Sequence, residues 1–284
     1  SYSRRCVSIM AIKYLDTKRI RGSSSVPKEA TTITSGLKAY YNCDSATVNN
    51  NATSGDSLGS SANGTNNGAD LNTDDEKFGT GCLNFNGSTD YVACNGVIAG
   101  LTTAGTISVW CNFDTLDVNS EGGGKVCAFG DADGNTFIEL SFNSSGALTA
   151  QGRQSGTKQW VATGGSGLTT TGWHHVVLTH DGTEPRLYVN GVETTTLNPS
   201  YTSHSYWIST ATGLDEFRLG MQYHSSGIDG KFDGLMDDVG IWNRALTQAE
   251  ITSLYATNEK ATLVTAAPTK SLDVHDDDKV TAGG

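Results

Sequence analysis

Short segments in which apolar and polar residues alternate recur along most of the chain, about every ten residues. Alternation with a period of two is typical of a strand that buries one face, because successive side chains point to opposite sides of a sheet. Gly, Asn, Asp and Ser separate these segments and favour turns. The segments that we expect to be strands are 37–41, 82–85, 91–94, 106–113, 125–129, 136–142, 148–151, 216–220 and 234–242.

The clearest pattern covers residues 173–193, where two turn-forming dipeptides divide an apolar-rich segment. Asp181-Gly182 and Asn190-Gly191 favour the positive φ angles of tight hairpin turns. We therefore expect three consecutive antiparallel strands here. The polar segment 42–77 is expected instead to be a long connecting segment on the surface.

One helix is expected near the C-terminal end. Thr247 and Glu250 have the spacing of a capping box, in which the two side chains satisfy the free N–H groups of a helix start. Ala249, Leu254 and Tyr255 then give a helix of about two turns an apolar edge.

Together these elements predict an all-β protein: an antiparallel two-sheet jelly-roll sandwich with one short C-terminal-side helix. Hydrophobic residues make up 36% of the 284 residues, which is enough for a core. No apolar stretch approaches the roughly 18 residues of a membrane span. We divide the chain into a basic arm and linker at 1–36, a jelly roll at 37–257 and an acidic tail at 258–284.

Three strings resemble the laminin G-like, concanavalin A-like jelly rolls, in that family's order. They are an early strand pair at 83–92, a central hairpin at 173–191 and a closing signature, Gly-Leu-Met-Asp-Asp-Val-Gly-Ile-Trp-Asn-Arg-Ala-Leu-Thr-Gln-Ala-Glu-Ile, at 234–251. The resemblance spans about 37–257 and implies the jelly-roll fold. It does not fix a function, because this fold serves lectins, adhesion modules, enzymes and structural proteins.

Charge is distributed unevenly along the chain. Residues 1–28 carry seven basic residues against one acid, a charge of +6, so the rest carries −17 of the total of −11. Such an arm suits a negative partner: nucleic acid, a membrane surface or the acidic face of a neighbouring subunit, whereas the acidic body disfavours nucleic acid outside the arm. The alternative is a solvated leader. The arm residues expected to act in assembly are Arg4, Arg5, Lys13, Lys18, Arg19 and Arg21.

Residues 11–22, Ala-Ile-Lys-Tyr-Leu-Asp-Thr-Lys-Arg-Ile-Arg-Gly, resemble a leader of structural proteins of environmental, marine viruses. That resemblance implies that the arm is an assembly element of a virion and that the jelly roll is its displayed or shell-forming domain.

Six cysteines lie at positions 6, 43, 82, 94, 111 and 127, with no CxxC pair to suggest a zinc site. Two disulfides, Cys82–Cys94 and Cys111–Cys127, are one hypothesis, because each pair flanks an expected hairpin. Reduced cysteines that pack as small apolar core residues are the other.

Enzymatic chemistry finds little support in the sequence. Glycoside hydrolases of this fold place two carboxylates on one strand face, about 5 Å apart. Glu139 stands alone on its expected strand, and the adjacent Asp237 and Asp238 would face opposite ways. No histidine has a Ser or Cys neighbour that suggests a nucleophile. We therefore expect a protein that is not an enzyme.

Two carboxylates are candidates for a structural calcium ion, which needs several oxygen ligands. The family resemblance implies one acid near the start of the jelly roll and one in its closing strand, which here are Asp44 and Asp237. Asp56 and Asp90 are further candidates. The alternative is that Asp44 and Asp90 cap turns.

Exposed aromatic rings that stack on sugars, next to polar groups that bind hydroxyls, are typical of lectin sites. Residues 198–208 are polar and carry three aromatic residues, with another in the next loop; Trp160 is a more distant candidate. A subunit contact is the alternative, because Tyr and Trp are enriched in interfaces. The residues expected to bind carbohydrate are Tyr201, Tyr206, Trp207 and Tyr223.

The sequence therefore predicts a non-enzymatic structural protein of a virus-like particle or extracellular assembly, located in the virion or outside the cell. It would form homo-oligomers through the basic arm, and its jelly roll could bind glycans. A secreted monomeric carbohydrate-binding module is the alternative.

Overall fold

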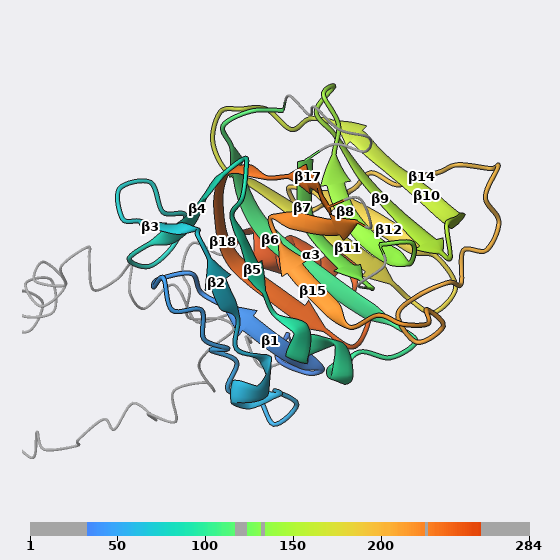
Figure 1. Ribbon diagram of the computed structural model, residues 1–284, viewed down its shortest axis with the longest axis horizontal. Coiled ribbons are helices and arrows are strands. Elements are labelled where there is room, and N and C mark those ends of the chain that lie inside the picture. The colour runs from blue at the N-terminus through green and yellow to red at the C-terminus, as the bar shows by residue number, and fades with distance from the viewer. Residues whose placement is uncertain (1–32, 117–123, 132–133, 225–226, 257–284) are drawn as a thin grey trace, which may run out of the picture.

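A computed structural model describes residues 33–116, 124–131, 134–224 and 227–256, without the side chains of 223–224 and 227–229. The described residues form two large antiparallel sheets packed face to face, which confirms the predicted sandwich (Figure 1). The basic arm, apart from 33–36, and the tail at 258–284 lie outside the described residues. No helix among the described residues has the length and apolar composition needed to cross a bilayer.

The first sheet, sheet A, has its longest strands at the centre. Strand β6 (Gly105–Phe113) pairs with β11 (His174–His180) on one side and with β18 (Asp233–Trp242) on the other, and β1 (Leu37–Tyr41) also pairs with β18. Apart from β1, the strands of sheet A lie in the spatial order β13 (Val192–Glu193), β12 (Pro185–Val189), β11, β6, β18, β4 (Cys82–Asn86) and β3 (Asp70–Asn72).

The second sheet, sheet B, is also antiparallel, and β7 (Gly124–Gly130), β8 (Phe137–Phe142) and β9 (Ala147–Gln154) form its centre. A separate two-stranded hairpin, β16 (Met221–His224) with β17 (Gly227–Lys231), follows β15. The strands of sheet B lie in the spatial order β14 (Thr196–Leu197), β10 (Thr157–Ser166), β9 (Ala147–Gln154), β8 (Phe137–Phe142), β7 (Gly124–Gly130), β15 (Glu216–Leu219), β5 (Tyr91–Ala93) and β2 (Thr65–Asn67).

The three strands expected over 173–193 are β11, β12 and β13. Asn190 and Gly191 form the turn between β12 and β13 with φ angles of 50° and 79°, which agrees with the turn type predicted for this dipeptide. Between β11 and β12 the connection is longer. There the Asp181 carboxylate accepts the N–H groups of Thr183 and Glu184, and Gly182 has a φ of 95°.

The interior between the sheets is apolar and closely packed. Its centre is a set of aromatic rings from both sheets, in which Phe113 of β6 lies 4.5 Å from Phe142 of β8 and 5.5 Å from Phe232, between ring centroids. Two short 3-10 helices, η2 (Gly59–Ala62) and η3 (Asn95–Gly100), add Ala62 and Val97 to this core.

The cysteines settle the choice between two hypotheses. All five described cysteines are buried thiols, so the disulfides Cys82–Cys94 and Cys111–Cys127 are wrong, and the apolar-core alternative is confirmed for these residues. Cys111 of β6 and Cys127 of β7 lie in the core between the two facing sheets, where they pack as small apolar side chains. Cys6 lies outside the described residues.

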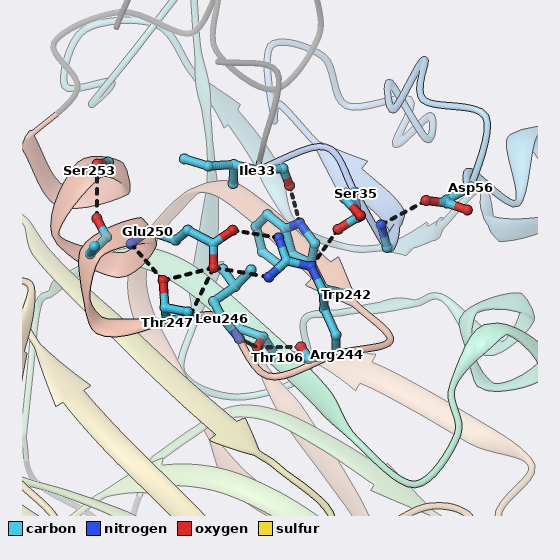
Figure 2. A network of polar contacts seen from close by, with 12 residues as sticks. Ile33, Ser35, Asp56, Thr106, Trp242, Arg244, Leu246, Thr247, Glu250 and Ser253 are labelled. Atoms are coloured by element: carbon cyan, nitrogen blue, oxygen red, sulfur yellow. Dashed lines mark hydrogen bonds and ion pairs between the residues drawn. The ribbon is translucent and has the colours of Figure 1, made fainter. Parts of the chain in front are cut away.

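Helix α3 (Gln248–Ala256) begins at the predicted capping box (Figure 2). The Thr247 N–H donates to Glu250 Oε2 (2.8 Å), and the Glu250 N–H donates to the Thr247 hydroxyl (3.3 Å). Arg244 binds the same carboxylate and also donates to the carbonyl of Ser35 (2.7 Å). The network therefore ties the start of α3 to the segment that precedes β1.

Candidate functional site

The outer faces of the two sheets differ in polarity. On sheet A, a second apolar cluster fills the space under α3, with Trp242 and Val177 from the sheet packed against Ile251 and Leu254 of the helix. On sheet B, most of the side chains of β8 and β9 that alternate with core residues are polar; Phe137 and Ala147 are the exceptions. We call this outer surface of sheet B the polar face; it consists of Lys125, Glu139, Ser141, Thr149, Gln151, Glu216 and Arg218 together with Tyr91.

The centre of the polar face is a linked set of side chains on three neighbouring strands. The Gln151 amide donates to Glu139 Oε1 (2.7 Å), and Lys125 Nζ lies 2.9 Å from Glu139 Oε2. Beside them the hydroxyls of Ser141 and Thr149 are 2.8 Å apart. Lys125 and Glu139 are buried, whereas Gln151 and Thr149 are half-buried, so the edge on β9 is the part that a ligand can reach.

At the other edge, Arg218 lies over the ring of Tyr91, with its guanidinium carbon 4.7 Å from the ring centroid. Arg218 also forms an ion pair with Glu216 Oε1 (2.8 Å). The second oxygen of Glu216 is buried and accepts no hydrogen bond from the described residues. A carboxylate, a guanidinium and an aromatic ring that lie side by side suit a ligand rich in hydroxyl groups.

Two of the predicted carbohydrate-binding residues are core residues instead, which corrects their predicted role. Trp207 is 1% exposed and stacks on His180, with ring centroids 4.7 Å apart; Tyr206 is 7% exposed and its hydroxyl donates to the carbonyl of Arg153 (2.9 Å). The local cause is a pair of turns, closed by Tyr206 N–H to Ser203 and by Thr210 N–H to Trp207, which direct the rings inward. Rings that are buried in this way offer no face to a sugar.

The other predicted aromatic residues have different positions. Tyr201 remains half-buried at the surface, where Lys158 Nζ lies 5.9 Å from its ring centroid. Trp160 is fully buried, and its indole N–H donates to the carbonyl of Tyr206 (2.7 Å). The side chain of Tyr223 lies outside the described part of the chain. Among the predicted rings whose side chains the structure describes, Tyr201 is therefore the one that is not buried.

Asp44 and Asp237, the predicted calcium ligands, bind one loop. Asp44 Oδ1 accepts the Thr80 N–H (2.7 Å), and Asp237 Oδ2 accepts the N–H groups of Lys77 (3.1 Å) and Phe78 (2.9 Å). These donors fit carboxylates that hold a loop. Among the described residues no three His, Cys, Asp or Glu side chains gather as a metal site.

Calcium binding at Asp44 and Asp237 stays a prediction. It would require a cation to replace peptide donors at both carboxylates. A melting curve measured with calcium and with a chelator tests it: a rise in melting temperature with calcium that is lost in Asp44→Asn would support the site, and equal curves would contradict it.

Sequence reasoning missed a serine–histidine contact. Ser108 Oγ lies 2.7 Å from His175 Nε2, on neighbouring strands of sheet A, and no motif could have shown it because the residues are 67 positions apart. Trp110 and Tyr255 stack on the imidazole, and Ser108 and His175 are 4% and 1% exposed. A substrate has no access to this pair in the structure.

The chain belongs to the concanavalin A-like lectin/glucanase superfamily, whose sequence model matches residues 86–252. No curated protein matches the chain.

Solved structures with the same fold include carbohydrate-binding proteins. The CBM40 domain of the Ruminococcus gnavus IT-sialidase, bound to alpha2,3 sialyllactose, matches with a TM-score of 0.53 and 16% identity over 61% of this chain and 96% of that one. Domain 4 of AbnA, a GH43 extracellular arabinanase from Geobacillus stearothermophilus, was solved in complex with arabinotriose. It matches with a TM-score of 0.55 and 21% identity over 77% of this chain and 98% of that one. The botulinum neurotoxin serotype D/C binding domain matches with a TM-score of 0.57 and 13% identity over 81% of this chain and 54% of that one. These likenesses show the fold.

Proposed function

We propose that this protein is a non-enzymatic carbohydrate-binding module whose ligand lies on the polar face of sheet B. The observation that carries the proposal is the contrast between the sheets: α3 and apolar packing cover the outer face of sheet A, whereas the outer face of sheet B carries linked polar groups. Its centre is buried, and the groups that a ligand can reach are the half-buried ones at its two edges, Thr149, Gln151, Glu216, Arg218 and Tyr91. Structural neighbours that were solved with sialyllactose and arabinotriose support a glycan ligand.

Sugar recognition would combine the groups at the two edges of the face. Gln151 and Thr149 offer an amide and a hydroxyl on β9, while Glu216 offers a half-buried carboxylate and Tyr91 an aromatic surface beside Arg218. Hydroxyl groups donate and accept hydrogen bonds, so they match this mixed set better than a purely apolar or purely anionic ligand does.

A glycan array followed by titration of the strongest ligand tests the proposal. We expect binding to weaken at least tenfold in Arg218→Ala. Arg186→Ala is the matched control, because Arg186 is also an ion-paired arginine on a sheet but lies on sheet A, where it should leave binding unchanged. Equal effects of the two substitutions, or no ligand on the array, would sink the proposal.

We further propose that the module is part of an assembly, held by the basic arm, as in a virus-like particle or another extracellular structure. The supporting observation is the charge of +6 on residues 1–28 against −17 on the rest. The arm residues Arg4, Arg5, Lys13, Lys18, Arg19 and Arg21 lie outside the described residues.

Sedimentation at low and high salt tests the assembly. The full chain should form a large particle that loosens as salt screens the charges, and a chain without residues 1–28 should remain a folded monomer. A full chain that is monomeric at every salt concentration would refute the assembly and leave the free-standing carbohydrate-binding module.

A further inference from the structure

The ion pair at the centre of sheet B is unusually well buried. Lys125 of β7 and Glu139 of β8 are 1% and 2% exposed, and Nζ lies 2.9 Å from Oε2. Burying two opposite charges costs several kcal/mol for each ion, which their attraction repays only with good geometry and additional hydrogen bonds. Among the described residues no hydrogen bond reaches Oε2, which meets Nζ as an ion pair.

The surroundings of the pair favour contact between a nucleophile and a carboxyl group. Neighbouring antiparallel strands hold the two side chains, with Lys125 opposite Ser141 and Glu139 opposite Ala128 in the register of β7 and β8. Reacting atoms that a rigid frame keeps about 3–3.5 Å apart gain much of the entropy that a reaction in solution must lose. The second oxygen, Oε1, accepts a hydrogen bond from the Gln151 amide (2.7 Å).

We propose that Lys125 and Glu139 condense to form an isopeptide bond, a covalent link between β7 and β8. A proton first passes from the ammonium to Oε2, which leaves a neutral amine and a neutral carboxylic acid. The amine nitrogen then attacks Cδ of Glu139. The new N–C bond replaces the Cδ–Oε2 bond, the amine gives up one further proton, and one water molecule leaves.

Each group has a defined part in this reaction. Lys125 is the nucleophile and Glu139 the acyl group. The Gln151 N–H stabilises the negative charge that develops on Oε1 as the amine attacks. Condensation needs no oxidant, cofactor or second substrate, and it removes two buried charges. The inference concerns residues beneath the proposed glycan surface and does not depend on glycan binding.

Intact-mass spectrometry of the purified full chain tests the bond. We expect a mass lower than that of the sequence by one water molecule. Trypsin cannot cleave after an amidated lysine, so it should release one peptide, Phe78–Arg153, that is lighter by the same water molecule. The full mass, with Phe78–Lys125 and Val126–Arg153 as separate peptides, would overturn the proposal.

Three substitutions locate the chemistry. Lys125→Arg keeps the positive charge but lacks the amine nucleophile, so it should show the full mass. Lys158→Met, on the exposed part of β10, is the control and should keep the missing water. Gln151→Leu should lower the cross-linked fraction in freshly purified protein. A missing water in Lys125→Arg would overturn the assignment to Lys125, and an unchanged fraction in Gln151→Leu would overturn the part given to Gln151.

Discussion

At the scale of single residues, burial determines which protonation state the interior accepts. His175 is enclosed by Trp110, Tyr255 and Ser108, and burial, with the nearby charge of Lys77, lowers its pKa from 6.5 to about 3. In the folded protein this imidazole is therefore neutral over the whole physiological range, whereas in the unfolded chain it takes up a proton below about pH 6.5.

This difference predicts a loss of stability in acid. Between pH 6.5 and 3 the unfolded state binds one proton more at His175 than the folded state, so the free energy of unfolding falls as the pH falls. In His175→Gln the fall should be shallower by up to about 1.4 kcal/mol per pH unit. Urea unfolding at several pH values measures how the free energy of unfolding depends on pH, and His204→Gln is the control variant. An unchanged slope in His175→Gln would contradict the expectation.

The buried thiols should be inert in the folded protein. Burial raises the pKa of Cys94 to about 12 and also raises the pKa of Cys111 and Cys127, and the thiolate is the reactive form. In a Cys6→Ser variant we expect no fast reaction with a thiol reagent until the chain unfolds, and then five reactive groups. Finding only one thiol after unfolding without reductant would revive the two-disulfide hypothesis.

At the scale of elements, the helix and the strands depend on a few local contacts. The closing strand β18 has a register shift between Asp237 and Gly240, and Asp238 there has a φ of 51°. The irregularity places the adjacent carboxylates in different roles: Asp237 holds the 77–78 peptide groups, and Asp238 bonds to the hydroxyl of Tyr40.

The capping box of α3 gives an element-scale prediction. Thr247→Ala removes the hydroxyl that caps the helix and should lower the free energy of unfolding by about 1 kcal/mol. Ser253→Ala, which removes a hydroxyl bonded within the same helix, is the control and should change it less. Chemical denaturation measures the free energy of unfolding of both variants, and an equal decrease in Thr247→Ala and Ser253→Ala would refute the capping role.

Some elements could not be predicted because tertiary pairing decides them. Strand β10 has only Trp160 and Ala162 as inward apolar residues before two glycines, so its alternation is short. Strands β2 and β3 lie in the polar connecting segment 42–77. They are strands because β2 pairs with β5 and β3 pairs with β4. By contrast, β11 to β13 carry their own turn signals and followed from the sequence.

The candidate site was harder to predict than the fold. Polar neighbours suggested that Tyr206 and Trp207 are exposed, but the turns around them direct both rings into the core. The polar face joins residues from β5, β7, β8, β9 and β15, and only the strand register shows that Glu139 lies opposite Gln151. Glu139 stands alone in the sequence because its partners are on other strands.

At the scale of the whole molecule, the sandwich has one covered face and one polar face. Helix α3 and its polar network close the outer side of sheet A, and the proposed isopeptide bond would brace the centre of sheet B. A rigid, polar sheet surface is a suitable scaffold for sugar recognition, because side chains on strands are positioned more firmly than those on loops.

The most direct test of this account is to map a bound glycan on the protein by NMR. Arabinotriose, α2,3-sialyllactose and the best array ligand would be titrated into the isotope-labelled full chain while amide shifts are followed. We predict that the shifts gather on β7, β8, β9 and β15, around Gln151 and Arg218. Shifts confined to sheet A, or none with any oligosaccharide, would contradict the assignment of the polar face as the binding site.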